Sequence, residues 1–237
     1  VFDGRLEGVL SLEKKMKEAK YFKYDKINEK LDFLIKMAWE LLQKKAQYNF
    51  IEMNKEASLQ LQYANILQSL ISTSRYSDEE IVKVALEKTI YIQNKKPQEA
   101  DLILETKVDN QPYIIAIEMK CYRRRTSSDR SRGAMDIFVK DVYEDIEVLE
   151  NYKLTNKDIK KTYFLAMTDH LNFVLPKYKS AKYWDYDISD GFILNGPRAF
   201  STPIGGKETC IHINGKYKFE WSKVSNNKNS FYFLLLE

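Results

Sequence analysis

The segment "YIIAIEMKCY", at residues 113–122, sets the strongest condition on the fold. Side chains of a β-strand alternate between its two faces, and both faces of this segment are apolar as far as Ile117. A strand of this kind is typical of a sheet that is covered on both sides. Glu118 and Lys120 share one face at the end of the segment. The sequence therefore predicts a covered strand that ends in two charged side chains.

Segments with helical or strand periodicity surround this one in a definite order. Apolar residues at spacings of three and four predict helices over residues 5–20, 24–47, 54–72 and 134–152. Shorter apolar or alternating runs predict strands over residues 81–92, 100–106, 113–122 and 160–170. Around the middle of the chain the order is helix, three strands, helix, strand. This order predicts an α/β protein with a mixed sheet and helices packed on it.

The chain divides into three expected parts. Residues 1–50 form a helical segment, residues 51–175 the α/β core, and residues 176–237 a β-rich appendage packed on that core. Within the appendage, residues 211–221 alternate around Asn214-Gly215, a pair that strongly favours a β-hairpin. The final residues, "SFYFLLLE", predict a last strand.

Two carboxylates are expected to meet at the end of the covered strand. If the strands over 100–106 and 113–119 are neighbours, Asp101 lies near Glu118. Paired carboxylates can hold Mg²⁺, which prefers oxygen ligands and retains several waters. Such a metal stabilises charge on a phosphate and lowers the pKa of a bound water, and Lys120 could orient or help deprotonate that water. The alternative is a structural ion pair of Glu118 and Lys120 with a neighbouring strand.

A third carboxylate is expected on the inward face of a helix. In the helix predicted over residues 54–72, Glu56 lies on the same side as Leu59 and Tyr63, given about 100° per residue. This places a carboxylate among residues that face the core. The alternative is that Glu56 only complements the dipole at the start of its helix.

Positive charge is concentrated just after the covered strand. Residues 121–132 contain five arginines and one aspartate, a local charge of +4 that equals the net charge of the whole chain. Such a block indicates binding of nucleic-acid phosphates, and arginine can also read guanine. The alternative is an ordinary solvated loop. The arginines concerned are Arg123, Arg124, Arg125, Arg130 and Arg132.

Asp101, followed after sixteen residues by Glu118-Met119-Lys120, resembles the signature of the PD-(D/E)xK nuclease superfamily. The residue before Asp101 is alanine, where the family pattern has proline. The resemblance implies a restriction-endonuclease-like core of helix, three strands, helix and strand. It also implies a Mg²⁺ site, with Mn²⁺ as the alternative metal. Its ligands would be Asp101, Glu118, the Met119 carbonyl and Glu56, which matches a glutamate on the family's first core helix, while Lys120 would serve the attacking water.

This resemblance implies a DNA endonuclease that acts on duplex DNA. A type II restriction enzyme is the specific form expected, as a homodimer if both strands are cut. Two alternatives stay open. One is a catalytically inactive module of the same fold that binds nucleic acid or protein. The other is a nuclease that acts on RNA or on single strands in a defence or mobile-element system.

Several other classes of protein are not expected from this sequence. Its two cysteines cannot build a disulfide framework or a four-cysteine zinc site. Cys121 adjoins the expected site without a partner base, so a cysteine nucleophile is not expected. No segment approaches the length of a membrane helix and no signal peptide is visible at the start. These features favour a cytoplasmic, reducing compartment.

Overall fold

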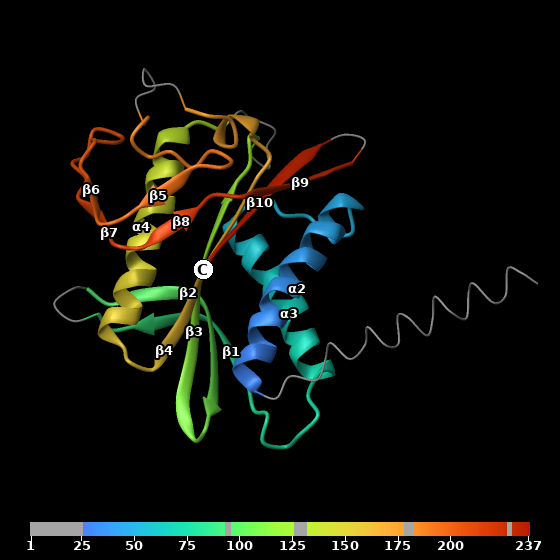
Figure 1. Cartoon of the computed structure of the whole chain (residues 1–237). Helices are drawn as coiled ribbons and strands as arrows, with labels where there is room; N and C mark the ends of the chain where they lie inside the picture. The colour runs from blue at the N-terminus through green and yellow to red at the C-terminus, as the bar shows by residue number, and fades with distance from the viewer. Residues whose placement is uncertain (1–25, 93–95, 126–131, 178–182, 227–228) are drawn as a thin grey trace, which may run out of the picture.

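The computed structural model describes residues 26–92, 96–125, 132–177, 183–226 and 229–237 (Figure 1). Its helices are α2 (Ile27–Gln47), α3 (Glu56–Thr73), α4 (Met135–Thr155) and the 3₁₀ turn η2 (Leu171–Phe173). Its longer strands are β1 (Lys83–Ile90), β2 (Gln98–Val108), β3 (Gln111–Tyr122), β4 (Ile159–Thr168), β9 (Trp221–Ser225) and β10 (Ser230–Leu236). Its short strands are β5 (Ile193–Asn195), β6 (Arg198–Phe200), β7 (Ile211–Ile213) and β8 (Lys216–Lys218). The helix expected over residues 5–20 lies outside the described residues.

A six-stranded mixed sheet forms the centre, in the order β1-β2-β3-β4-β10-β9. Adjacent strands of this sheet are antiparallel, except β3 and β4, which are parallel and are connected through α4. A parallel pair requires a crossover connection, and the expected helix supplies it. The order α3, β1, β2, β3, α4, β4 agrees with the order predicted from the sequence, and the α/β class is confirmed.

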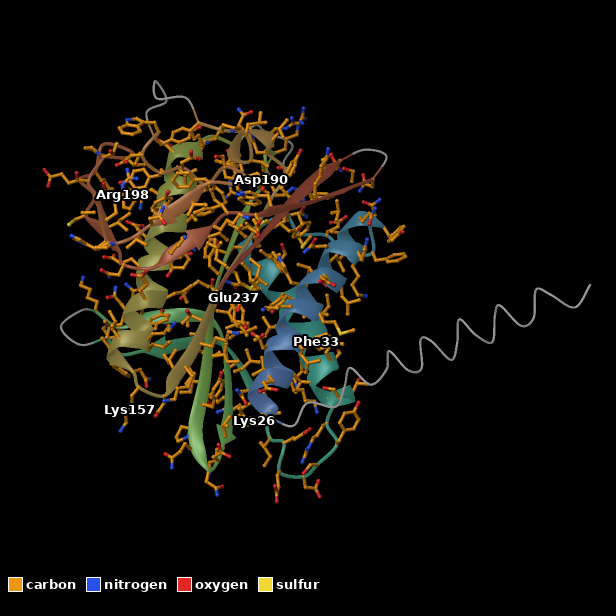
Figure 2. All side chains as sticks on the ribbon, viewed as in Figure 1. Lys26, Phe33, Lys157, Asp190, Arg198 and Glu237 are labelled. Carbon is orange, nitrogen blue, oxygen red and sulfur yellow. The ribbon has the colours of Figure 1, made fainter. Side chains whose placement is uncertain are left out.

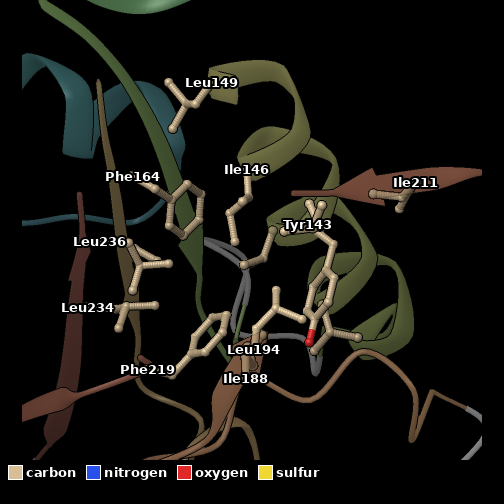
Figure 3. Packing of buried hydrophobic residues seen from close by; sticks show 14 of the residues in the cluster. Tyr143, Ile146, Leu149, Phe164, Ile188, Leu194, Ile211, Phe219, Leu234 and Leu236 are labelled. Atoms are coloured by element: carbon tan, nitrogen blue, oxygen red, sulfur yellow. The ribbon is translucent and has the colours of Figure 1, made fainter. Parts of the chain in front are cut away.

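Helices and small strands cover the two faces of the sheet. α2 and α3 lie on one face, whereas α4 and strands β5 to β8 lie on the other (Figure 1). Along β3, Ile115 and Ile117 pack in the core under α2 and α3, and Ala116 packs in the core under α4. Figure 3 shows the core under α4, where Ile146 of α4 faces Phe164 of the sheet and Tyr143 of α4 stacks on Phe219. Side chains from the sheet and its covering layers fill the space between them (Figure 2).

The hairpin predicted around Asn214-Gly215 is wrong. β7 and β8 do not pair with each other, because β7 pairs with β6 and β8 pairs with β5. Glu150 of α4 explains the difference, since its carboxylate accepts hydrogen bonds from the backbone N–H groups of Asn214 (2.8 Å) and Gly215 (2.7 Å) and from the Tyr217 hydroxyl (3.0 Å). The turn is therefore attached to a helix instead of closing a hairpin.

The last two strands of the expected appendage belong to the central sheet. β10 pairs with β4 in the middle of the sheet, and β9 pairs with β10 at its edge. Strands β5 to β8 form two separate two-stranded sheets beside α4. Residues 176–237 thus contribute both to the covering layer and to the sheet itself.

Replacing Glu150 by alanine is expected to lower the free energy of unfolding by about 3 kcal/mol. The carboxylate accepts from the backbone N–H groups of Asn214 and Gly215 and from the Tyr217 hydroxyl. Water can replace part of these bonds at this partly exposed site, so the expected loss equals about one or two hydrogen bonds to a charged group, at roughly 1.5 to 3 kcal/mol each. Urea unfolding followed by circular dichroism measures the change. Glu144→Ala is the control, because Glu144 pairs with Lys140 on its own helix. Equal midpoints for the two variants would contradict the anchoring role.

Membrane helices and disulfides are both missing from the described part of the chain. None of its helices combines the length and apolar character needed to span a membrane. Cys121 is buried and Cys210 is exposed, and both are free thiols. Burial raises the pKa of the Cys121 thiol to about 12, so this cysteine stays protonated and unreactive at neutral pH.

Candidate active site

The central sheet opens between β2 and β3. Pairing of these strands runs from their shared turn to Leu102 and Ile117 and stops there. β3 nevertheless stays paired with β4 up to its last residue, and β2 stays paired with β1. The next residues along the two separating strands are Asp101 and Glu118. The predicted carboxylate pair therefore stands at the point where the sheet opens.

Asp101 lies in this opening, and its carboxylate accepts hydrogen bonds from β3 on one side and from α3 on the other. One carboxylate oxygen accepts a hydrogen bond from the backbone N–H of Met119 at 2.5 Å, which is a donor that the β2–β3 ladder no longer serves. The other oxygen accepts from the side-chain amide of Gln60 on α3 at 2.7 Å. Burial raises the pKa of Asp101, and the negative charge of Glu87 on β1 adds to that rise. The Glu118 side chain also lies against the Asp101 carboxyl group and lowers its pKa in part.

Glu118 is the most deeply buried carboxylate of the group, with 5% of its surface exposed. Its Oε1 accepts a hydrogen bond from the hydroxyl of Tyr152 on α4 at 3.0 Å. Burial raises its pKa well above the usual range, and the nearby carboxylates of Asp145 and Asp101 raise it further. A buried anion of this kind requires a cation or a proton.

Lys120 stands between two helices. Its Nζ lies 3.0 Å from Asp145 Oδ2 on α4 and 3.4 Å from Glu56 Oε1 at the start of α3. Burial disfavours the charge on this amine, but the carboxylates of Asp145, Glu56 and Asp101 outweigh burial and raise the pKa of Lys120. The ammonium form therefore persists at neutral pH, so Lys120 is available to stabilise negative charge and not to take up a proton.

Sequence reasoning missed Gln60, Asp145 and Tyr152. All three carried a detectable signal, because each is a polar group at an inward-facing position of an amphipathic helix. Asp145 lies three residues after Val142 and four before Leu149, both of which are buried. A carboxylate at such a position must find a partner inside the protein.

The donor chemistry of the site suits a hard divalent cation. Four carboxylates surround a single ammonium group, and burial raises the pKa of each of them. Among the described residues, no group of three or more His, Cys, Asp or Glu side chains is arranged to hold a metal ion as it stands. The carboxyl groups of Asp101 and Glu118 instead lie next to each other, and burial and the charge of Asp101 raise the pKa of Glu118. Oxygen donors and excess negative charge fit Mg²⁺, and a bound metal would offset the carboxylate charges that otherwise raise these pKa values. The four carboxylates belong to Glu56, Asp101, Glu118 and Asp145.

The arginine block has two kinds of member in the structure. Arg123 is built into the fold, since its guanidinium donates to Asp169 Oδ2 at 2.9 Å and to the Met53 carbonyl at 2.8 Å. Arg124, Arg125 and Arg132 are exposed. Arg130 lies outside the described residues.

If the chain binds duplex DNA, replacing Arg124 and Arg132 together by alanine is expected to weaken that binding. Each lost phosphate contact should reduce the slope of log affinity against log salt by about 1. Filter binding between low and moderate salt, with Ca²⁺ in place of Mg²⁺, measures the slope. Lys216→Ala, which removes an exposed lysine of β8 outside the arginine block, is the control. An unchanged slope in the double variant would show that these arginines do not contact phosphates.

The structure brings four of the predicted site residues together: Glu56, Asp101, Glu118 and Lys120. Met119 contributes its backbone N–H to Asp101, and the described arginines of the block follow the end of β3. No protein-family model matches the chain, and no curated protein or solved structure matches it either. A functional assignment therefore depends on the geometry and charge of these side chains.

Proposed function

We propose that this chain is a Mg²⁺-dependent nuclease that hydrolyses phosphodiester bonds in DNA. Its core would be restriction-endonuclease-like, and a type II restriction enzyme is the specific form proposed. The observation that supports this best is the meeting of Asp101, Glu118, Glu56 and Lys120 where β2 and β3 separate. Carboxylates that can hold a metal and an ammonium group that can stabilise developing charge suit metal-assisted phosphate chemistry.

The excess of carboxylates supports a requirement for metal. A polyanionic substrate would be repelled by the buried acids unless a divalent cation offset their charge. Asp101 and Glu118 would hold Mg²⁺, together with the Met119 carbonyl and Glu56, and Mn²⁺ is the alternative metal. When bound, the metal would stabilise charge on the phosphate and lower the pKa of a coordinated water.

The protein's own groups would orient the reactants. The charged Lys120 would face the phosphate and the attacking water and would stabilise negative charge as it develops. Tyr152 and Gln60 each bond one carboxylate of the pair and would fix its orientation, as partners of ligands do in metal sites. Lys120 already carries its proton, so it would not act as the base, and the proton of the attacking water would pass to solvent.

Incubation with supercoiled plasmid DNA and Mg²⁺, with and without EDTA, tests the proposal. Cleavage that depends on Mg²⁺ and is lost in Glu118→Gln supports it, since that variant keeps the size of the side chain. Parallel reactions with single-stranded DNA and RNA identify the preferred substrate. No cleavage of any of the three, together with no Mg²⁺ or Mn²⁺ binding by calorimetry, would favour the inactive binding module.

The products of the same reaction test the more specific form. Discrete linear fragments would indicate cutting of both strands at defined sequences, as expected of a dimeric restriction enzyme. Sedimentation with and without DNA then measures the oligomeric state. Nicked circles or a continuous smear would count against the restriction enzyme while leaving the nuclease intact.

A further inference from the structure

Asp145 on α4 contacts the proposed active site without belonging to its expected ligand set. We propose that Asp145 is a positioning residue that anchors the Lys120 ammonium group and thereby leaves Glu56 able to turn toward a metal ion. This inference rests on the proposed function, because the anchored group is the cation that would stabilise the reacting phosphate. It extends that function to a residue on the opposite helical layer.

The ion pair between Lys120 and Asp145 is the closer and the less exposed of the two that Lys120 makes. Its N–O distance is 3.0 Å, against 3.4 Å to Glu56. The Asp145 side chain is 15% exposed and that of Glu56 is 38% exposed, so water screens the Glu56 pair more strongly. Asp145 Oδ2 is itself buried and receives no well-aligned hydrogen bond from the described residues. The Lys120 ammonium is therefore its nearest compensating charge.

One helix reaches both charged residues at the end of β3. Asp145 contacts Lys120, and Tyr152, two turns later on α4, donates to Glu118. Seven residues of helix span about 10 Å, so the two contacts act at separate points along a rigid element. α4 also packs directly on β3 and β4 through its apolar stripe. The helix can thus hold Glu118 and Lys120 in a fixed relation to each other.

Anchoring by Asp145 resolves a conflict over Glu56. Glu56 is a proposed metal ligand, yet its carboxylate also pairs with the Lys120 ammonium group. If Glu56 were the sole partner, its movement to a metal would release the ammonium group from the site. With Asp145 in place, Glu56 can exchange its partner while Lys120 keeps its position. Misplacement of a reacting group by about 1 Å can cost roughly a hundredfold in rate, so this anchor has a measurable effect.

The test compares Asp145→Asn, Asp145→Glu and the control Glu144→Gln, all on α4. We expect Asp145→Asn to lower the single-turnover rate of DNA cleavage by roughly 30-fold at saturating DNA, with affinity in Ca²⁺ unchanged. Asp145→Glu, which keeps the charge, should recover much of that rate. Glu144→Gln should match the wild type, because Glu144 pairs with Lys140 at the surface of α4.

A second readout does not depend on nuclease activity. Acetylation of lysine amines, followed by mass spectrometry of the folded protein, reports how firmly each amine is held. Asp145→Asn should increase labelling of Lys120 several-fold and leave Lys140 unchanged, whereas Glu144→Gln should do the reverse. If the wild type cleaves no nucleic acid, the proposed function fails, and increased labelling of Lys120 still supports the anchor. Unchanged labelling of Lys120 in Asp145→Asn overturns the inference, whatever the cleavage rates.

Discussion

Replacing Lys120 by alanine is expected to lower the rate of DNA cleavage by about a thousandfold while DNA affinity stays nearly constant. The ammonium group is held between Asp145 and Glu56, and its raised pKa keeps it charged at neutral pH. Removing a cation aimed at charge that develops in the transition state typically costs about 10² to 10³ in rate, and more where it also orients water. Single-turnover cleavage with Mg²⁺ and filter binding with Ca²⁺ measure the two quantities on one preparation.

Two further variants separate a loss of catalysis from a loss of folding. Lys120→Met keeps the apolar stem of the side chain and loses only the charge, so it should be as inactive as the alanine variant with a smaller loss of stability. Lys140→Ala removes a lysine of α4 that pairs with Asp141 and Glu144, and it should cleave at the wild-type rate. The loss of a catalytic cation usually lowers the rate by far more than about threefold. If Lys120→Met cleaved within that factor of the wild-type rate, Lys120 would have no role in the proposed reaction.

The covered sheet was predictable because its signals are local. Alternation of side chains and apolar character on both faces of residues 113–117 indicate a strand covered on two sides, and Ile115 and Ala116 do lie in opposite cores. The crossover helix followed from the stripe of apolar residues in α4. The opening of the sheet beyond Leu102 and Ile117 was not predictable, since it depends on where two strands cease to pair.

Distant partners account for what sequence reasoning missed. Asp145 sits on an apolar stripe, and this signal indicates a partnered acid without naming the partner. Lys120 is 25 positions away along the chain and reaches Asp145 only through packing of α4 on the sheet. The error at Asn214-Gly215 has the same origin, because a carboxylate on α4 outcompetes the local preference for a hairpin. Local propensity yields to tertiary contacts that satisfy the same backbone groups.

Without divalent metal, the protein is expected to become less stable as the pH rises from about 5 to about 8. Burial raises the pKa of Asp145 to about 7, although the nearby Lys120 opposes the rise. In the unfolded chain an aspartate has a pKa of about 3.9. Between these two values the folded protein binds more protons than the unfolded chain, so the free energy of unfolding falls with rising pH. Only about two pH units of this interval lie above pH 5, so Asp145 contributes roughly 3 kcal/mol between pH 5 and pH 8. The raised pKa values of Glu118, Asp101 and Glu56 act in the same direction.

Thermal unfolding in EDTA at pH 5 and pH 8 measures this effect. For a domain of this size, a loss of roughly 3 kcal/mol lowers the Tm by about 6 to 10 °C. Mg²⁺ at pH 8 should recover much of the loss, because it binds the deprotonated carboxylates of the folded state, and at pH 5 it should change the Tm little. Asp145→Asn is the control and should show a flatter dependence on pH. Two results would contradict this prediction: a wild-type Tm that does not fall between pH 5 and pH 8 in EDTA, or a Mg²⁺ effect that is equal at both pH values. Either result would mean that protons and Mg²⁺ do not compete for the carboxylates around Lys120.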